Sequence, residues 1–270
     1  MATYSSPLVA EHTLQPVRMR APLRGFANLL RKEQGLWWDT RKWLVHLLVW
    51  PLIMNGMVVV AAFNFAKEPN FTALQIADTV TTLFFLVAGQ AAALGAVVAT
   101  QGALVGEKQR GTAAWILSKP VSRSAFVLAK LVAQAVNVIG LAVVLPSLIF
   151  WEQSIILWGS APDLVAFVGS VLLLALHVLF YLALTLLLGT LVQSSGPVAG
   201  IALGGLLGGL MAQDRLAQLA RVMPWVLPSA AGLHATQVAG VQWALPGIAT
   251  GIWIALFVAV ALWRFRREEF

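Results

Sequence analysis

The sequence predicts an all-α integral membrane protein that crosses the bilayer six times. Of its 270 residues, 59% are hydrophobic and only 11% are charged, whereas about a quarter of the residues in a soluble domain are charged. A spanning helix needs roughly 20 apolar residues, and five stretches without Asp, Glu, Lys or Arg reach that length. These stretches are 44–66, 79–106, 131–151, 164–213 and 222–263. We therefore expect lipid, and not a protein core alone, to cover this apolar surface.

Turn-forming residues divide the two longest of these stretches. Residues 193–197 read Gln-Ser-Ser-Gly-Pro, and proline ends or kinks a helix while Ser and Gly favour turns. Pro224, Pro228 and Pro246 interrupt the last stretch in the same way. The resulting prediction is a re-entrant or interfacial hairpin over 214–245, before the sixth span, or a seventh span if that hairpin crosses the bilayer. The six predicted spans are 44–66, 79–105, 128–151, 164–190, 196–212 and 246–263.

The basic residues predict the orientation of these spans. With six crossings, 15 of the 18 Lys and Arg residues fall on one side of the membrane, and Lys67, Arg215 and Arg221 fall on the other. Loops rich in Lys and Arg stay in the cytoplasm, so we expect both termini there, in a multi-pass protein of the cell (inner or plasma) membrane. The net charge of +7 is then a sign of topology, and we expect no nucleic-acid partner.

Three regions follow from this layout. Residues 1–22 mix Pro, Arg, Glu and His, and we expect a flexible cytoplasmic arm. Residues 23–43 place Phe26, Leu29, Leu30 and Trp37 on one helical face, which is typical of an amphipathic helix in the membrane interface. Residues 44–270 then form a single transmembrane domain.

Small and polar residues inside the spans are candidates for helix packing or for a pathway. Glycines four residues apart leave one helix face nearly bare, which allows close helix approach. That contact could lie within the chain, at a subunit interface or along the wall of a pathway. The stripe comprises Gly196, Gly200, Gly204 and Gly208. Asn55 and His177 are the candidate polar pathway residues, although an ordinary interhelical hydrogen bond would also explain His177.

No residue pattern predicts a catalytic or a metal site. The chain contains no cysteine, which excludes thiolate ligands and thiol catalysis. Residues 106–112 read G-x-x-x-x-G-T, close to a phosphate-binding loop, but the phosphate-binding lysine is missing and no strand precedes them. We therefore expect no nucleotide to bind this chain.

The loop between the second and third spans is dense in charged residues, whereas the stretches 79–106 and 131–151 on either side contain none. Thr112 can cap a short helix over 113–117, which Ser118-Lys119-Pro120 must end. Ser122 or Ser124 can then cap the third span. The apolar tip Trp115-Ile116-Leu117 lies between charged flanks, so we expect a groove on a soluble protein, and not lipid, to receive it.

This loop resembles a known family. Glu107-Lys108-Gln109-Arg110-Gly111-Thr112, followed by Leu117-Ser118-Lys119-Pro120-Val121-Ser122-Arg123, resembles the E-[KR]-x-R-G-T…L-[ST]-x-P-[VI]-[ST]-R signature of type 2 ABC-transporter permeases. In that family the signature lies between the second and third spans and forms a cytoplasmic coupling helix. The hairpin sequence Met223-Pro224-Trp225-Val226-Leu227-Pro228 departs from the aromatic-rich sequence that is usual for the family at this place. The resemblance therefore does not identify a substrate.

The resemblance implies the membrane subunit of a transporter. Two copies, most simply a homodimer, would pair with two separate ATPase subunits that bind ATP and Mg, and a periplasmic or extracellular accessory protein could join them. Glu107, Arg110 and Thr112 would shape the loop, and Trp115 to Leu117 would dock. The implied ATPase-coupling residues are Glu107, Lys108, Arg110, Gly111, Thr112, Trp115, Ile116, Leu117, Ser118, Pro120, Ser122 and Arg123.

Two alternatives remain at this stage. One is a permease of the same family that serves metal-centre maturation, such as copper-site assembly. The other is a secondary transporter driven by an ion gradient, which would favour acidic residues inside the spans and inverted repeats. Asp78 and Asp163 lie only at span edges, and the two halves of the chain show no convincing repeat, so we favour the ABC permease.

Overall fold

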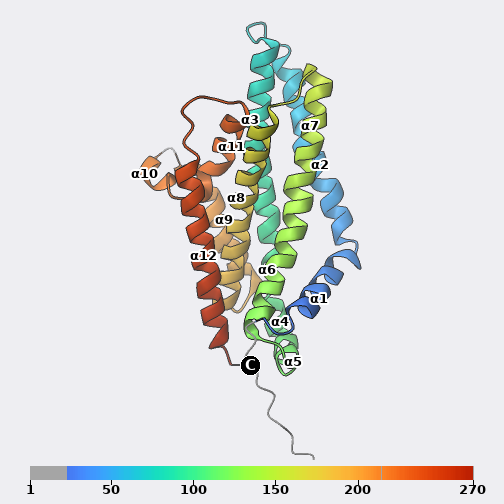
Figure 1. Cartoon of the computed structure of the whole chain (residues 1–270), viewed down its shortest axis with the longest axis vertical. Coiled ribbons are helices and arrows are strands. Elements are labelled where there is room, and N and C mark those ends of the chain that lie inside the picture. Colours follow the sequence, from blue (N-terminus) through green and yellow to red (C-terminus); the bar gives the residue numbers. More distant parts are fainter. Residues whose placement is uncertain (1–22, 214, 270) are drawn as a thin grey trace, which may run out of the picture.

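The computed structural model describes residues 23–213 and 215–269, and the predicted arm at 1–22 lies outside the described residues. Within these residues, six helices are long and apolar enough to cross a membrane, and they run along the long axis of the molecule (Figure 1). They span Lys42–Phe65, Ala73–Gln109, Arg123–Trp158, Leu164–Leu191, Ser195–Ala212 and Ala244–Arg266. The six-span all-α prediction is confirmed.

The second and third spans are longer than predicted. Helix α3 (Ala73–Thr100) begins six residues before the predicted start, because Thr72 and Gln75 form a capping box in which the Thr72 amide donates to Gln75 Oε1 at 2.9 Å. The third span joins α6 (Arg123–Ile139), the π-helical turn η1 (Gly140–Val144) and α7 (Leu145–Trp158). The π turn precedes Pro146 and accommodates its missing N–H, so the helix continues past the predicted end at Trp151.

Helix α1 (Phe26–Trp38) confirms the amphipathic helix before the first span, α2 (Lys42–Phe65). It lies oblique to the bundle axis, at the lower right of Figure 1. Its apolar face packs on protein, because Leu29 and Trp37 are buried and Phe26 and Leu30 pack against the same core. Helix α6 is its main neighbour. Its placement in the membrane interface stays a prediction.

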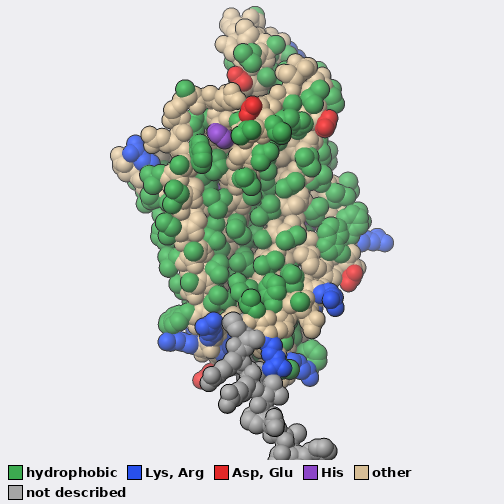
Figure 2. Space-filling view, in the orientation of Figure 1, with side chains coloured by type: hydrophobic (Ala, Val, Ile, Leu, Met, Phe, Trp, Pro, Cys, Tyr) green, Lys and Arg blue, Asp and Glu red, His purple; other side chains and the backbone are tan. Residues whose placement is uncertain are grey.

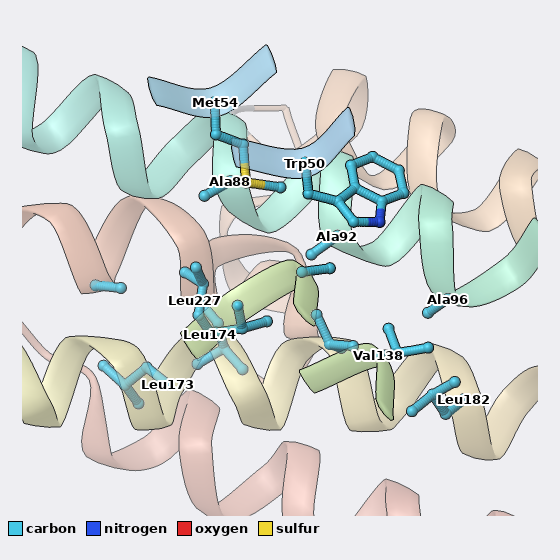
Figure 3. Close-up of a cluster of buried hydrophobic side chains, with 14 of the residues drawn as sticks. Trp50, Met54, Ala88, Ala92, Ala96, Val138, Leu173, Leu174, Leu182 and Leu227 are labelled. Carbon is cyan, nitrogen blue, oxygen red and sulfur yellow. The ribbon is translucent and has the colours of Figure 1, made fainter. Parts of the chain in front are cut away.

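The core forms around α3 and α8 (Leu164–Leu191), which contact each other and most of the other spans. Ala88, Ala92 and Ala96 recur every four residues on α3 and are fully or almost fully buried, and Trp50 and Met54 of α2 lie over this strip of small residues (Figure 3). A Cβ at Gly95 would collide with the Trp50 indole. Small residues on α3 thus let bulky neighbours approach closely.

Among the described residues, the segment before the last span folds into short helical elements and contains no helix long enough to be a seventh span. Its re-entrant or interfacial placement stays a prediction. It contains α10 (Ala217–Ala220), the 3₁₀ turn η2 (Pro224–Val226) and α11 (Leu227–Ala235), all too short to cross a bilayer, and it leads to α12 (Ala244–Arg266). Helix α11 docks on α3, where Gly89 admits Pro228. His177 Nδ1 hydrogen-bonds the Pro224 carbonyl at 2.9 Å. His177 itself lies about 20 Å along α8 from Leu164, at the usual helical rise per residue.

The surface agrees with a membrane setting. In Figure 2, hydrophobic side chains cover the middle of the molecule, while basic side chains gather at its lower end, around α4 (Val105–Gln109), α5 (Thr112–Leu117) and the start of α6. The same end of the bundle holds the C-terminal end of α12 (Figure 1). This distribution matches the charge asymmetry in the sequence.

Candidate coupling site at the α4–α6 end

The charged loop folds into two short helices at one end of the bundle. Helix α4 continues the second span, and a turn at Gly111, with φ of 69°, reverses the chain into α5. Only glycine adopts this left-handed conformation without strain, which explains the glycine of the signature. Residues 106–112 resemble a phosphate-binding loop in sequence, but most of them belong to helix α4.

The caps of these helices correct one prediction and confirm another. Thr112 does not cap α5; it is the first residue of the helix, and Gly111 occupies the cap position. The Thr112 hydroxyl instead donates to the Glu107 carbonyl at 3.1 Å, which ties α5 to α4. Ser122 does cap α6, because its hydroxyl accepts from the Ala125 amide at 3.0 Å.

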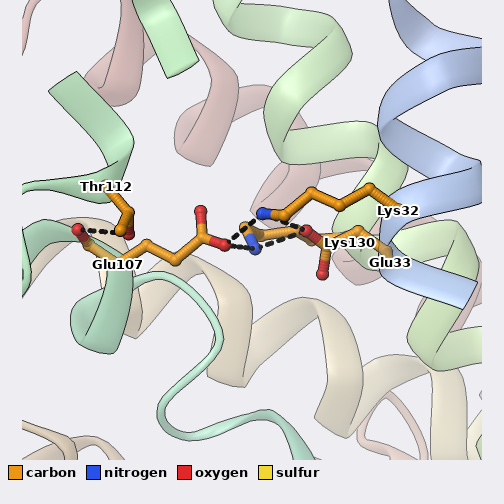
Figure 4. A network of polar contacts seen from close by, with 5 residues as sticks. All are labelled: Lys32, Glu33, Glu107, Thr112 and Lys130. Atoms are coloured by element: carbon orange, nitrogen blue, oxygen red, sulfur yellow. Dashed lines mark hydrogen bonds and ion pairs between the residues drawn. The ribbon is translucent and has the colours of Figure 1, made fainter. Parts of the chain in front are cut away.

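Four charged side chains join α1, α4 and α6 in one network (Figure 4). Glu107 Oε1 accepts from Lys32 Nζ at 2.6 Å and pairs with Lys130 Nζ at 3.1 Å. Lys130 Nζ also contacts Glu33 Oε1 at 2.9 Å, and Lys32 Nζ approaches the same oxygen at 3.4 Å. We call Lys32, Glu33, Glu107 and Lys130 the ion network; its formal charge is zero.

Burial makes the ion network a strong constraint. Lys130 is only 2% exposed, and Glu33 and Glu107 are buried as well. A buried charge that loses its partner costs about 3–5 kcal/mol, so the three helices are held in one arrangement. Burial lowers the pKa of Lys32, but its hydrogen bond and ion pair with Glu107, and the charge of Glu33, outweigh that effect and hold the pKa above its ordinary value.

Sequence reasoning missed Glu33 and gave Lys130 no role beyond topology. Glu33 lies on the same helical face as Leu29 and Trp37, and an acid on an apolar face was the signal that could have identified it. Lys130 lies seven residues into α6, next to no acid in the sequence. Its partner is 97 positions away, which no local pattern shows.

The three predicted docking residues have different environments. Trp115 is 66% exposed, with Lys119 Nζ 5.2 Å from its ring centre. Ile116 is buried and Leu117 is partly buried, and both pack against the core. Trp115 is therefore the member of the tip that a partner protein can reach, while Ile116 and Leu117 fix α5 to the bundle. Of the remaining predicted coupling residues, the exposed ones are Arg110, Gly111, Thr112, Ser118 and Pro120.

Two basic residues of the signature bind the C-terminal end of α12. Arg123 NH1 donates to the carbonyls of Arg266 at 2.8 Å and of Glu268 at 2.6 Å. Lys108 Nζ pairs with Glu268 Oε1 at 2.8 Å. A cation here also complements the partial negative charge at a helix C-terminus. The α4–α6 segment is thus joined to the sixth span as well as to the second and third.

Comparison with known proteins decides the family. The family model for "ABC-2 family transporter protein" matches residues 52–212, more than half of the chain and including α4, α5 and α6. The chain belongs to the ABC-2 transporter family. No curated protein matched the chain.

As an ABC-2 transporter protein, the chain is a multi-pass membrane permease and is not itself catalytic. The resemblance carried by residues 107–123 is confirmed at the level of the family. Among the residues that the structure describes, no three His, Asp or Glu side chains are grouped so that they could hold a metal ion.

The remaining predicted residues of this ABC-2 protein lie away from the α4–α6 segment. Glycines 196, 200, 204 and 208 are exposed on α9 (Ser195–Ala212), with open space where each Cβ would lie. Asn55 is buried on α2, and neither side-chain polar atom has a partner among the described residues. His177 is buried on α8 and holds η2 through its Nδ1, which is an interhelical hydrogen bond of the ordinary kind.

Proposed function

We propose that this permease works as a pair of copies and couples, through α5, to two separate ATPase subunits that bind ATP and Mg. The observation that carries the proposal is the exposed Trp115 on a helix whose Ala113, Ile116 and Leu117 pack in the bundle. Large exposed aromatic residues are typical of binding hot spots. Here Trp115 projects from the basic end of the molecule, where a soluble partner has access, and we place that end and both termini in the cytoplasm of a cell-membrane protein.

The contacts of α5 explain how a push on Trp115 reaches the spans. Thr112 joins α5 to α4, which continues the second span. Glu107 on α4 then joins α6 and α1 through the ion network, and Lys108 joins α12. Because these pairs are short and mostly buried, α5 cannot move alone; a displacement tilts the attached helices together. Rigid-body movement of packed helices is a common form of conformational switch.

The exposed glycine face of α9 supports the pairing of two permeases. A Cβ at Gly196, Gly200, Gly204 or Gly208 would meet nothing within the chain. Bare backbone on the outside of a spanning helix favours close contact with another helix. We therefore place α9 at the subunit interface, beside the pathway that the pair encloses.

Site-specific cross-linking tests the coupling proposal cleanly, because the chain has no native cysteine. We would co-express Trp115→Cys with a candidate ABC ATPase that carries a surface cysteine, add a short bifunctional thiol reagent, and look for a permease–ATPase product. Phe71→Cys, which is exposed in the loop between α2 and α3 at the opposite end of the bundle, is the matched control. A product from position 115 alone supports the proposal. Equal products from both positions, or none from position 115 in an intact complex, contradict it.

A further inference from the structure

A polar cavity lies beside the ion network. It has a volume of about 470 Å³, within the range of small-molecule sites, and residues of α1, α2, α3, α4, α6 and α9 line it. Lys42 and Arg110 are the basic lining residues outside the ion network, and neither forms an ion pair with any residue that the structure describes. Since the network itself is neutral, these two cations give the cavity an unbalanced positive charge that favours an anionic group.

His46 adds a neutral donor to the two cations. Its Nδ1 accepts a hydrogen bond from Trp50 Nε1 at 2.7 Å, so in the neutral ring the proton is on Nε2, which can donate. His46 lines the same cavity as Lys42 and Arg110. An ammonium, a guanidinium and an imidazole N–H around one cavity are donors that suit a phosphate group.

Two residues that line the same cavity each carry a buried acceptor without a donor. Gln134 is 8% exposed and Glu107 is 6% exposed, and both line the cavity. Gln134 Oε1 and Glu107 Oε2 have no hydrogen-bond partner among the described residues. Figure 4 shows the two lysines sharing one carboxylate oxygen of Glu107, while the other oxygen turns away from them. Buried acceptors of this kind call for a donor, which a ligand with N–H groups beside its anion can supply.

Two exposed apolar residues line one part of the cavity. Leu36 on α1 and Val98 on α3 line the cavity and are each about half exposed. Leu94 lies one helical turn from Val98 on the same face of α3 and is also exposed. These residues form an apolar strip from the cavity into the spanning region, where an acyl chain can lie.

We propose that this cavity binds the head group of an ammonium-bearing phospholipid, such as phosphatidylethanolamine, from the leaflet at the α4–α6 end. The phosphate binds Lys42, Arg110 and His46, and the acyl chains follow the strip at Val98 and Leu94. The primary ammonium donates to Glu107 Oε2 and Gln134 Oε1 once these two side chains rotate towards the cavity. The head group contacts Glu107 directly, so an occupied cavity adds a ligand to the network that joins α1, α4 and α6. The proposal concerns binding by the permease itself and goes beyond coupling to an ATPase.

Native mass spectrometry of the full-length permease, without any ATPase, tests this binding. The protein is released from nanodiscs that contain equal parts of phosphatidylethanolamine, phosphatidylcholine and phosphatidylglycerol, and the retained lipids are counted. We expect phosphatidylethanolamine to be retained roughly tenfold more than phosphatidylcholine, whose trimethylated nitrogen cannot donate hydrogen bonds. Equal retention of the two, or preferential retention of phosphatidylglycerol, would overturn the proposal.

Three variants assign the binding to this cavity. Lys42→Ala should lower the retention of phosphatidylethanolamine roughly tenfold, whereas Arg41→Ala, an exposed neighbour outside the cavity, should not. Gln134→Leu removes an unpartnered acceptor, so it should reduce the preference for phosphatidylethanolamine over phosphatidylcholine. Unchanged retention in both Lys42→Ala and Gln134→Leu would place the lipid elsewhere.

A competition experiment separates a lipid from a soluble ligand of the same chemistry. Free phosphoethanolamine and inorganic phosphate are added to the protein before the lipids are counted. If the site binds a lipid, millimolar phosphoethanolamine competes weakly and phosphate does not compete, because neither occupies the apolar strip. Complete displacement by phosphoethanolamine at that concentration would show that the strip contributes nothing and would overturn the lipid assignment.

Discussion

Lys130 on α6 places its ammonium nitrogen 2.9 Å from the carboxylate of Glu33 on α1, across 97 residues of sequence. The pair joins the helix before the first span to the third span, and Glu107 extends the connection to α4 at 3.1 Å. Because all three side chains are buried, the arrangement has little freedom to relax when one member is lost.

Loss of the Lys130 charge should destabilise the folded permease. We expect Lys130→Ala to reduce the free energy of unfolding by about 3–5 kcal/mol, because Glu33 and Glu107 each lose an ion pair in a buried setting. Thermal unfolding of the detergent-solubilised protein measures the effect. Arg31→Ala, at an exposed position of α1, is the control and should change stability by less than about 0.5 kcal/mol. Similar melting curves for the two variants would contradict the structural role of the ion network.

The contribution of Lys32 should depend on pH in a defined direction. Its pKa is raised above 10.5 in the folded protein, so its stabilising effect is fully present below 10.5 and is lost as the pH rises through the higher folded value. The difference in melting temperature between the native protein and Lys32→Met should therefore stay constant from pH 7 to about 10 and shrink above that. A difference that disappears already near pH 8 would show that the pairing with Glu107 is not maintained.

Neighbouring residues on α5 should separate coupling from stability. Trp115→Ala removes an exposed side chain, so we expect normal insertion and melting but loss of substrate-stimulated ATPase activity and transport in the assembled complex. Ile116→Ala removes a buried side chain and should instead destabilise the permease by about 2–5 kcal/mol. Melting curves together with ATPase rates in proteoliposomes distinguish the two effects. If Trp115→Ala kept full coupled activity, the docking assignment would be wrong.

Two glycines of α9 should also respond differently to the same change. Gly204 has open space around it, so Gly204→Leu should leave the single chain folded but weaken its self-association by about 1–3 kcal/mol, as expected for an overpacked contact. Gly209 lies against the Trp225 indole, so Gly209→Leu should disturb the chain itself. Native mass spectrometry gives the subunit number, and melting gives the stability. Undiminished pairing in Gly204→Leu would remove the glycine stripe from the interface.

The spans could be predicted from sequence because each depends mainly on the length of an uncharged stretch. The exact ends of the spans were harder to predict, because they depend on local capping and turn signals. The Thr72–Gln75 capping box extends α3 beyond the uncharged stretch, and the π turn at Gly140–Val144 lets the third span pass Pro146. The positive φ at Gly111 could have been inferred from its glycine, and it would have excluded Thr112 as the cap.

The candidate site was only partly visible in the sequence. The signature could be recognised in the sequence because its glycine, serine cap and charges act over a few residues; its role in coupling stays a prediction. The partners of Glu107 and Arg123 come from α1, α6 and the end of α12, and contacts across such separations depend on the tertiary fold. The burial of Ile116 beside the exposed Trp115 likewise depends on how α5 packs against the bundle. The three consecutive apolar residues at 115–117 do not specify which of them faces the core.

The docking of α11 has a consequence for the order in which the chain assembles in the membrane. Pro228 fits against Gly89 of α3, and Gly232 lies against the Thr82 backbone of the same helix, while η2 is held by His177 of α8. The receiving surface exists only once the second and fourth spans are side by side. We therefore expect the hairpin at 215–243 to dock only after α3 and α8 have met, as a late step of biogenesis. Variants that slow the meeting of α3 and α8 should leave this segment open to proteases while the six spans are already inserted.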